Sequence, residues 1–301
     1  MSKENHLLRL IGNTPLVRLK SFEKKPTVKI YAKLEMMNPS GSLKDRIAKF
    51  MIEQAEQDGR LKPNNVIVEA SSGNTGIALS MVASLKGYKT KIFMPESKSM
   101  ERRVMMRMWG AELILTSRHN PHAHIEAAKE LAASGNGYFY IDQNENCYNP
   151  YAHYCTTAAE ILDQTNGSIT TFIAGIGTGG TIMGVGKKLK EVNPTTRVIG
   201  VHPAQPISRI EGLLHLDGSY LPGICNMSLV DELVGVSDEN AIETARSVAL
   251  AEGIFTGISS GATLWTAIQE AEKLDSGTVV VIFGDRGERY LSTDLCLHAR
   301  N

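Results

Sequence analysis

The sequence lacks the features that mark several specialised classes of protein. Its 301 residues include 32 Lys plus Arg against 32 Asp plus Glu. With no net charge and no long basic run, it has no field to attract nucleic acid or an anionic membrane surface. It has no apolar run of the roughly 18 residues that a membrane helix needs, and its start lacks the apolar core of a signal peptide. We therefore expect a cytoplasmic protein without nucleic-acid or membrane partners.

Cysteine is scarce as well, and the cysteines form no motif. Four of them lie scattered along the chain without a C-x-x-C pair: Cys147, Cys155, Cys225 and Cys296. A chain of this length builds its core without disulfides, so we expect reduced thiols. His119, His122 and His124 resemble a metal-binding cluster, but Pro121 interrupts them and no Cys or carboxylate shares their spacing. We expect a loop before a helix there, and no metal site.

What the sequence does contain is a regular alternation of strand-like and helix-like segments. Apolar, β-branched runs predict strands at 29–35, 66–70, 91–95, 111–116, 137–142, 169–177, 197–203 and 278–284. Helical patterns lie between them, from residue 44 and at 76–87, 100–110, 124–134, 156–165, 181–192, 238–253 and 262–274. Such alternation predicts an α/β fold with mostly parallel sheets and helices on both faces. We place a domain boundary near Asn149–Pro150, giving domains at 1–149 and 150–301.

In such folds ligands bind at the carboxyl ends of strands, on the loops that enter the next helix. Three loops that precede predicted helices are rich in glycine and hydroxyl side chains. They are SSGNTG (71–76), GIGTGGT (175–181) and GISSGA (257–262). The second matches G-x-G-x-x-G, but the next strand ends in His202–Pro203, with no acid to hold a ribose, and the P-loop pattern also fails. That loop is therefore either a cradle for a single phosphate or a tight turn. The loop at 71–76 is either an anion site, sized for a carboxylate, or a helix cap, and the one at 257–262 is either a corner that presents the hydroxyls of Ser259 and Ser260 or a serine cap.

Lys44 stands in the first turn of a predicted helix, behind the Ser/Gly-rich segment NPSGS. Ser42 and Asp45 have the S-x-x-D spacing of a capping box. A cation is poorly placed at a helix N-terminus, so Lys44 is either exposed at small cost or a neutral, reactive amine. A reactive lysine, a phosphate cradle, a carboxylate-sized anion site and a hydroxyl corner together suit pyridoxal 5′-phosphate (PLP).

Six motifs, spanning about residues 10 to 293, resemble the cysteine synthase (O-acetylserine sulfhydrylase) family of fold-type II PLP enzymes. They are IGNTPLVRL, PSGSLKDR, SSGNTGIAL, GTGGT, GISSG and GERYLST, and the segments DQNENCYNPYAHY and SYLPGICNMSLVDE are most similar to the B-type members. The resemblance implies two three-layer αβα domains like those of the tryptophan synthase β-subunit, with the first ~35 residues crossing to the other domain. It also implies β-replacement: O-acetyl-L-serine loses acetate to give an α-aminoacrylate, and sulfide adds to give L-cysteine.

The resemblance also implies roles for individual residues. Lys44 would carry the PLP and move the α-proton, and Asn74 would bind the PLP 3-oxygen. The phosphate would lie on Gly177, Thr178, Gly179, Gly180 and Thr181. The substrate carboxylate would lie on Ser71, Ser72, Gly73, Thr75 and Gln143. Ser259 would face the pyridine nitrogen, with Asp285 as the alternative group at that position.

Alternatives remain open at the level of the substrate. Asn144 follows Gln143 where the family often has an aromatic residue, and the segment 208–219 has Arg209 without the adjacent second arginine of some B-type enzymes. The sulfur donor is therefore either sulfide or thiosulfate, which would give S-sulfocysteine. Cystathionine β-synthase, a serine or threonine dehydratase and O-phosphoserine sulfhydrylase are alternative activities on the same fold, and a regulatory partner of serine acetyltransferase is an alternative of another class. The resemblance further implies a homodimer and a segment at roughly 85–130 that closes over the substrate.

Overall fold

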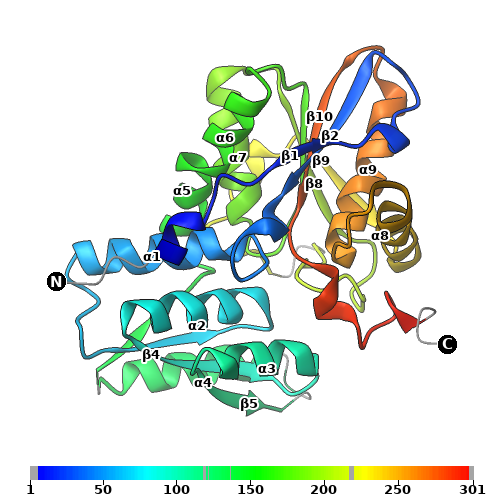
Figure 1. Cartoon of the computed structure of the whole chain (residues 1–301). Coiled ribbons are helices and arrows are strands. Elements are labelled where there is room, and N and C mark those ends of the chain that lie inside the picture. The colour runs from blue at the N-terminus through cyan, green and yellow to red at the C-terminus, as the bar shows by residue number, and fades with distance from the viewer. Residues whose placement is uncertain (1–5, 118–119, 121, 136, 217–219, 298–301) are drawn as a thin grey trace.

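Two β-sheets organise the chain in this computed structural model, which describes residues 6–117, 120, 122–135, 137–216 and 220–297. The six-stranded sheet has the order β1-β2-β10-β7-β8-β9, and the four-stranded sheet has the order β5-β4-β3-β6 (Figure 1). Every neighbouring pair is parallel except β1 with β2. The predicted α/β fold with mostly parallel sheets is confirmed.

The strands and helices follow one another in regular order. The strands are β1 (Leu16–Arg18), β2 (Val28–Leu34), β3 (Val66–Ala70), β4 (Lys89–Pro95), β5 (Glu112–Thr116), β6 (Tyr138–Tyr140), β7 (Thr171–Gly175), β8 (Arg197–Pro203), β9 (Glu232–Val236) and β10 (Gly277–Phe283). The helices are α1 (Lys44–Gln57), α2 (Asn74–Lys86), α3 (Met100–Met108), α4 (Ala123–Ala133), α5 (Tyr148–Cys155), α6 (Thr157–Gln164), α7 (Gly180–Val192), α8 (Asp238–Glu252) and α9 (Ile258–Lys273). Short 3₁₀ turns lie at His6–Leu10, Lys20–Phe22, Glu35–Met37, Met227–Leu229 and Gly287–Tyr290. None of the helices in the described ranges has both the length and the hydrophobicity to cross a membrane.

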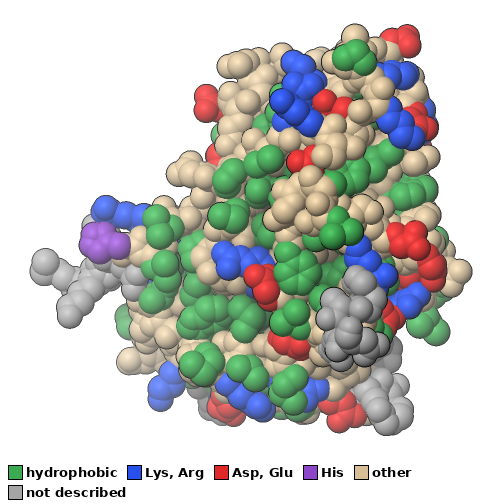
Figure 2. Space-filling model, turned by 45° about the vertical axis from the view of Figure 1, so that its right-hand side comes forward, with side chains coloured by type: hydrophobic (Ala, Val, Ile, Leu, Met, Phe, Trp, Pro, Cys, Tyr) green, Lys and Arg blue, Asp and Glu red, His purple; other side chains and the backbone are tan. Residues whose placement is uncertain are grey.

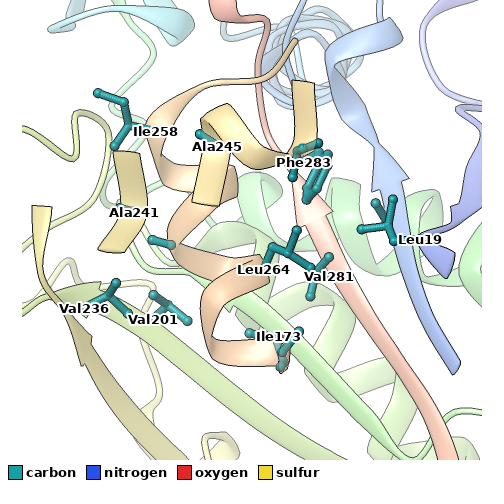
Figure 3. Packing of buried hydrophobic residues seen from close by; sticks show 14 of the residues in the cluster. Leu19, Ile173, Val201, Val236, Ala241, Ala245, Ile258, Leu264, Val281 and Phe283 are labelled. Atoms are coloured by element: carbon teal, nitrogen blue, oxygen red, sulfur yellow. The ribbon is translucent and has the colours of Figure 1, made fainter. Parts of the chain in front are cut away.

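The six-stranded sheet is buried on both faces, as its apolar strands predict. Val279 and Val281 of β10 pack with α8 and α9 on one face, and Figure 3 shows Val281 beside Leu264 of α9. Val280 and Ile282, the alternate residues of the same strand, pack with α6 and α7 on the other face. Because successive side chains of a strand point to opposite sides, one continuous apolar run fills two cores.

The four-stranded sheet repeats this arrangement on a smaller scale. Ile67 of β3 packs with α1 and α2, whereas its neighbour Val68 packs toward α4. In Figure 1, α2 and α3 cover one face of this sheet, and α1 lies between the two sheets. The first residue of α1, Lys44, therefore stands at the junction of the two halves of the molecule.

Several local expectations differ from the structure. The predictions did not include α5 and β9, and the helix expected at 262–274 begins earlier, at Ile258. The capping box was wrong in its geometry: the Asp45 carboxylate accepts hydrogen bonds from the backbone N–H and the hydroxyl of Ser40, while the Ser42 hydroxyl accepts from the Lys44 N–H at 3.3 Å. The tight turn at 38–42 lets Asp45 reach past Ser42. The expected domain boundary at Asn149–Pro150 lies in the first turn of α5 and stays a prediction.

Candidate active site

One cavity of about 590 Å³ lies where the carboxyl ends of the strands of both sheets meet. It is lined from both halves of the molecule, and all the residues predicted for the site lie on it: Lys44, Ser71, Ser72, Gly73, Asn74, Thr75, Gln143, Gly177, Thr178, Gly179, Gly180, Thr181, Ser259 and Asp285. Parallel strands end at a common edge, so the loops that follow β3, β6, β7 and β10 converge there.

Lys44 opens onto this cavity from the start of α1. Although the cavity leaves it partly accessible, dense surrounding protein removes water from its amine. This desolvation lowers the pKa of Lys44 from 10.5 to about 8, with the Asp285 carboxylate opposing the shift. The neutral amine is therefore available near physiological pH, which is the state that a nucleophilic or proton-moving lysine requires.

The loop between β7 and α7 has the geometry of an anion cradle. The backbone N–H groups of Gly177, Thr178 and Gly179 make no hydrogen bond within the described part of the chain. Gly179 has a φ of +85°, and a Cβ there would lie 1.9 Å from the Cys225 sulfur. A Cβ at Gly177 would lie 2.3 Å from the carbonyl oxygen of Gly212. Only glycine fits these two positions, and the unpaired N–H groups at the start of a helix suit a phosphate.

Thr181, the last residue predicted for this loop, has a partner behind it. Its hydroxyl lies 3.3 Å from Nε2 of His153, and the other ring nitrogen of His153 lies 2.9 Å from the Thr157 hydroxyl. Burial lowers the pKa of His153 well below its ordinary value, so the imidazole is neutral. It therefore positions the Thr181 hydroxyl without adding a charge.

The loop between β3 and α2 is fastened by side chains. The Ser71 hydroxyl accepts hydrogen bonds from the N–H groups of Gly76, at 2.9 Å, and Gly73, at 3.2 Å. Ser71 therefore holds the start of α2 from two residues before its N-cap, Gly73, a role close to the cap that the alternative interpretation of this loop expected. Ser72 is exposed and Asn74 is half-buried, and both face the cavity.

Gln143, which follows β6, closes the other side of this loop. Its Oε1 accepts a 2.5 Å hydrogen bond from the Thr75 hydroxyl, and its backbone N–H donates to Glu69. Asn149 on α5 donates from Nδ2 both to the Gln143 carbonyl at 2.8 Å and to the Thr178 hydroxyl at 3.1 Å. Asn149 thus links the expected substrate loop to the phosphate loop.

Asp285 lies after β10 with 1% of its surface exposed. Its Oδ2 accepts hydrogen bonds from Asn74 Nδ2 at 2.6 Å and from the Tyr290 hydroxyl at 2.9 Å. Asn74 Oδ1 and Asp285 Oδ1 are buried and have no partner in the described part of the chain. The hydroxyl of Ser259, in the first turn of α9, makes no hydrogen bond within the described part of the chain, and the residue lines the cavity. Orphaned polar atoms in a cavity are typical of a site that binds a polar ligand.

Sequence reasoning missed the residues that hold this site from behind or border its mouth. They are Glu69, Lys98, Arg102, His153, Glu211 and Tyr290, and Asn149 was noted only as part of a domain boundary. None lies in a glycine-rich loop, and their partners are distant in the sequence, so no local pattern marks them. Among the described residues, no group of three or more His, Cys, Asp or Glu could hold a metal ion; His119 lies outside them.

Comparisons with known proteins agree on one family of enzymes. The family model described as "pyridoxal-phosphate dependent enzyme" matches residues 7–285. The cysteine synthase B of Salmonella typhimurium is 46% identical over 96% of this chain and 95% of its own length. A cysteine synthase of Staphylococcus aureus is 44% identical over 97% of this chain and 96% of its own length.

Solved structures match over nearly the whole chain too. An O-ureido-L-serine synthase superimposes with a TM-score of 0.92 at 39% identity, covering 97% of this chain and 94% of its own. Isoform 3 of the O-acetylserine sulfhydrylase of Entamoeba histolytica gives a TM-score of 0.91 at 37% identity, covering 98% and 93%. Nearly the whole chain, with both sheets, therefore has a counterpart in these structures.

Proposed function

The chain belongs to the cysteine synthase family of pyridoxal-phosphate-dependent enzymes, and we propose that it makes L-cysteine from O-acetyl-L-serine and sulfide by β-replacement. Its cofactor is PLP, which when bound supplies an electron sink for chemistry at the substrate Cα and Cβ. One observation carries the proposal: the desolvated Lys44 amine shares a single cavity with a phosphate-sized cradle and a hydroxyl-rich loop at a helix start.

We propose that Lys44 holds the cofactor and moves the proton at the substrate Cα. Support comes from its lowered pKa, about 8, which leaves a useful fraction of neutral amine at neutral pH. The unpaired N–H groups at 177–179 and the hydroxyl of Thr181 would hold the phosphate, with Gly180 at the helix start. Asn74, with an orphaned Oδ1 and an Nδ2 that already donates to Asp285, would lie beside the cofactor ring.

The substrate carboxylate would lie on the loop at the start of α2. It would be surrounded by Ser71, Ser72, Gly73, Thr75 and Gln143. Because the Gly73 N–H and the Thr75 hydroxyl already have partners, the candidate donors are the Ser72 hydroxyl, the N–H groups of Ser72 and Thr75, and the Gln143 amide. A helix N-terminus favours an anion, and these small polar residues exceed what capping alone requires. Closure of both halves around the cavity would exclude water from the reacting Cβ and suppress hydrolysis.

We propose that Ser259, rather than Asp285, faces the pyridine nitrogen. Asp285 already accepts two hydrogen bonds at Oδ2, and its Oδ1 lies close to Gly257, where a Cβ would come within 2.0 Å of it. The Ser259 hydroxyl, by contrast, has no partner in the described part of the chain. A neutral hydroxyl need not protonate the ring, and Asp285 then acts by orienting Asn74.

The direct test is the visible absorption spectrum of the purified protein with PLP. We expect a band that changes when O-acetyl-L-serine is added, returns when sulfide is added, and accompanies the appearance of L-cysteine. Lys44→Ala should abolish this cycle. Lys49→Ala is the matched control, because Lys49 lies on the same helix and its Nζ donates to the Leu8 carbonyl, outside the cavity.

The outcomes separate the cofactor from the substrate. A protein that takes up no PLP would contradict the proposal at its base. A protein that takes up PLP but ignores O-acetyl-L-serine would keep the cofactor and redirect the search to O-phosphoserine, serine and homocysteine. The same spectrum of Asp285→Asn and Ser259→Ala tests the ring-nitrogen assignment, since only Ser259→Ala should shift the band of the resting enzyme strongly.

We also propose a homodimer located in the cytoplasm, with serine acetyltransferase as an additional partner. Figure 2 shows apolar side chains exposed among charged and other residues on one face of the molecule. On α3, Met100, Val104 and Met108 recur every four residues and are 58%, 49% and 78% exposed. Such a stripe supports a subunit interface, which light scattering would check.

The cysteines support the proposed location in the cytoplasm. None of the four cysteines, all in the described ranges, forms a disulfide, in keeping with a reducing compartment.

A further inference from the structure

The outer part of the cavity carries a group of charges that the proposed mechanism does not use. Lys98 and Arg102 approach from one half of the molecule, and Glu211 approaches from the loop that follows β8. The Glu211 carboxylate forms an ion pair with the Arg102 guanidinium, and its Oε1 lies 3.5 Å from Lys98 Nζ. One acid is thus shared between two cations at the mouth of the cavity.

Arg102 is a buried, fixed cation. Only 3% of its surface is exposed, its guanidinium lies over the Tyr290 ring at 4.9 Å, and Nη1 donates to the Ser99 hydroxyl at 3.2 Å. Burial lowers the pKa of Arg102, but Tyr290 and Glu211 raise it more, so the group stays charged. A buried cation needs a nearby negative charge, and in this structure Glu211 supplies it.

Glu211 is held at this position by its backbone. The N–H of Leu214 donates to the carbonyl of Ile176 at 2.8 Å, and the Gly212 carbonyl packs so closely that a Cβ at Gly177 would lie 2.3 Å from it. The loop carrying Glu211 therefore lies directly on the phosphate loop. The Glu211 carboxylate therefore faces the cavity from a segment whose backbone is fixed by these contacts.

The ion pair borders the place where the amino-acid substrate would lie. Arg102 touches the substrate loop, since a Cβ at Gly73 would come within 2.7 Å of its Nε. A substrate carboxylate on that loop would direct its β-substituent into the remaining space of the same cavity, toward Arg102 and Glu211. Without Glu211, two cations would face that space and favour an anionic substituent.

We propose that Glu211 is a specificity-determining residue that occupies Lys98 and Arg102 with an internal carboxylate and so selects against doubly charged substrates. This inference rests on the proposed function. A phosphate ester as leaving group, or thiosulfate as sulfur donor, would bring a dianion against the Glu211 carboxylate, and like charges at close range cost binding energy. An acetyl ester is neutral and hydrosulfide carries a single charge, so both meet a smaller penalty and the cavity favours them.

The test compares wild type with Glu211→Gln and Glu211→Ala. We expect kcat/KM for O-phospho-L-serine, and for thiosulfate, to rise relative to O-acetyl-L-serine with sulfide by about tenfold or more. Glu211→Asp, which keeps the charge, should stay close to wild type, and Arg102→Gln combined with Glu211→Gln should reverse the gain. Glu112→Gln is the matched control, because Glu112 pairs with Lys91 on an exposed strand outside the cavity.

Calorimetry with thiosulfate alone supplies a readout that does not depend on turnover. Glu211→Gln should bind thiosulfate about tenfold more tightly than wild type, and Glu112→Gln should not. A folded Glu211→Gln with an unchanged or reduced preference for the dianions would overturn the proposal and leave Glu211 a purely structural counter-ion. If no variant makes cysteine but thiosulfate still binds Glu211→Gln more tightly, the proposed function fails and the charge selection stands.

Discussion

The two loops that open α2 and α7 have similar sequences but are held in place by different means. In the loop at 175–180, the glycines are pressed against Cys225 and Gly212, and three N–H groups are left unpaired. In the loop at 71–76, the Ser71 hydroxyl accepts from the N–H groups of Gly73 and Gly76, and those of Ser72, Asn74 and Thr75 make no hydrogen bond within the described part of the chain. Both loops therefore offer unpaired donors, but one is fixed by backbone packing and the other by side-chain hydrogen bonds.

This difference matches the difference between a resident ligand and a transient one. A loop clamped by backbone packing cannot shift to satisfy its own N–H groups, so it gains their hydrogen bonds only when an anion is present, which favours permanent occupancy. A loop held by its own side chains keeps its shape without a ligand, so a substrate can enter and leave without a large energetic change. We therefore propose that the rigid loop binds the PLP phosphate and that the loop held by side chains binds the substrate carboxylate.

The sharpest way to break this comparison is Gly179→Ala. At a φ of +85° any Cβ is strained by about 1–2 kcal/mol, and here it would also meet the Cys225 sulfur at 1.9 Å. We expect PLP to bind about 30-fold more weakly or worse, equivalent to about 2 kcal/mol, as measured by absorbance titration.

Two variants separate the causes of that loss. Gly167→Ala has a similar φ of +71° with nothing within 4 Å, so it reports backbone strain alone, away from the site. Cys225→Ala combined with Gly179→Ala removes the clash and should recover part of the PLP affinity. Wild-type PLP binding by Gly179→Ala would show that the loop yields easily and that its rigidity does not matter.

A smaller effect is expected for Ser71→Ala in the other loop. The change leaves the N–H groups of Gly73 and Gly76 without their acceptor, which should cost about 1–2 kcal/mol of stability. We expect the KM for O-acetyl-L-serine to rise about tenfold, because the cap also shapes the carboxylate site. PLP affinity should change little, and steady-state kinetics with a PLP titration would measure both.

Ser237→Ala is the control for this substitution. Ser237 caps α8 by accepting from the Asn240 N–H at 3.2 Å, far along the chain from the loop at 71–76. It should lose a similar amount of stability with no change in KM. Equal KM values for Ser71→Ala and Ser237→Ala would mean that Ser71 serves only as a cap and that the two loops do not divide the ligands as we assign them.

The sequence was sufficient to predict both loops and Lys44 because each depends on local signals. Strand patterns place the loops at one edge of a parallel sheet, and glycine and hydroxyl residues identify them there. The supporting residues could not be predicted, because their partners are chosen by packing. Asn149 bridges Gln143 and Thr178, and Glu211 meets Arg102 across 109 residues of sequence. The partner of Asp45 could not be predicted either. Its carboxylate accepts from Ser40 and not from Ser42, because the turn between them determines which donor lies within reach.

The smallest effect on activity is expected for Glu69→Gln, which tests what supports the loop at 71–76 from below. Glu69 is fully buried beneath the substrate loop, where its carboxyl accepts from the N–H groups of Ala70 and Gln143. Burial raises the pKa of Glu69 from 4.5 to about 8, with hydrogen bonds from the backbone opposing the shift. The folded chain therefore keeps this proton where the unfolded chain has lost it.

The sign of the pH dependence follows from this proton. Between pH 4.5 and about 8 the unfolded state binds fewer protons at Glu69, so its contribution to the free energy of unfolding falls as pH rises. Glutamine imitates the protonated acid but does not titrate, so Glu69→Gln should lose this fall while keeping a KM near wild type at pH 7. Urea unfolding across the interval would measure it, with the exposed Glu130→Gln as control. If the free energy of unfolding of Glu69→Gln still falls between pH 4.5 and about 8, another group takes up the proton. The Glu69 carboxylate beneath the substrate loop would then be charged throughout this pH range.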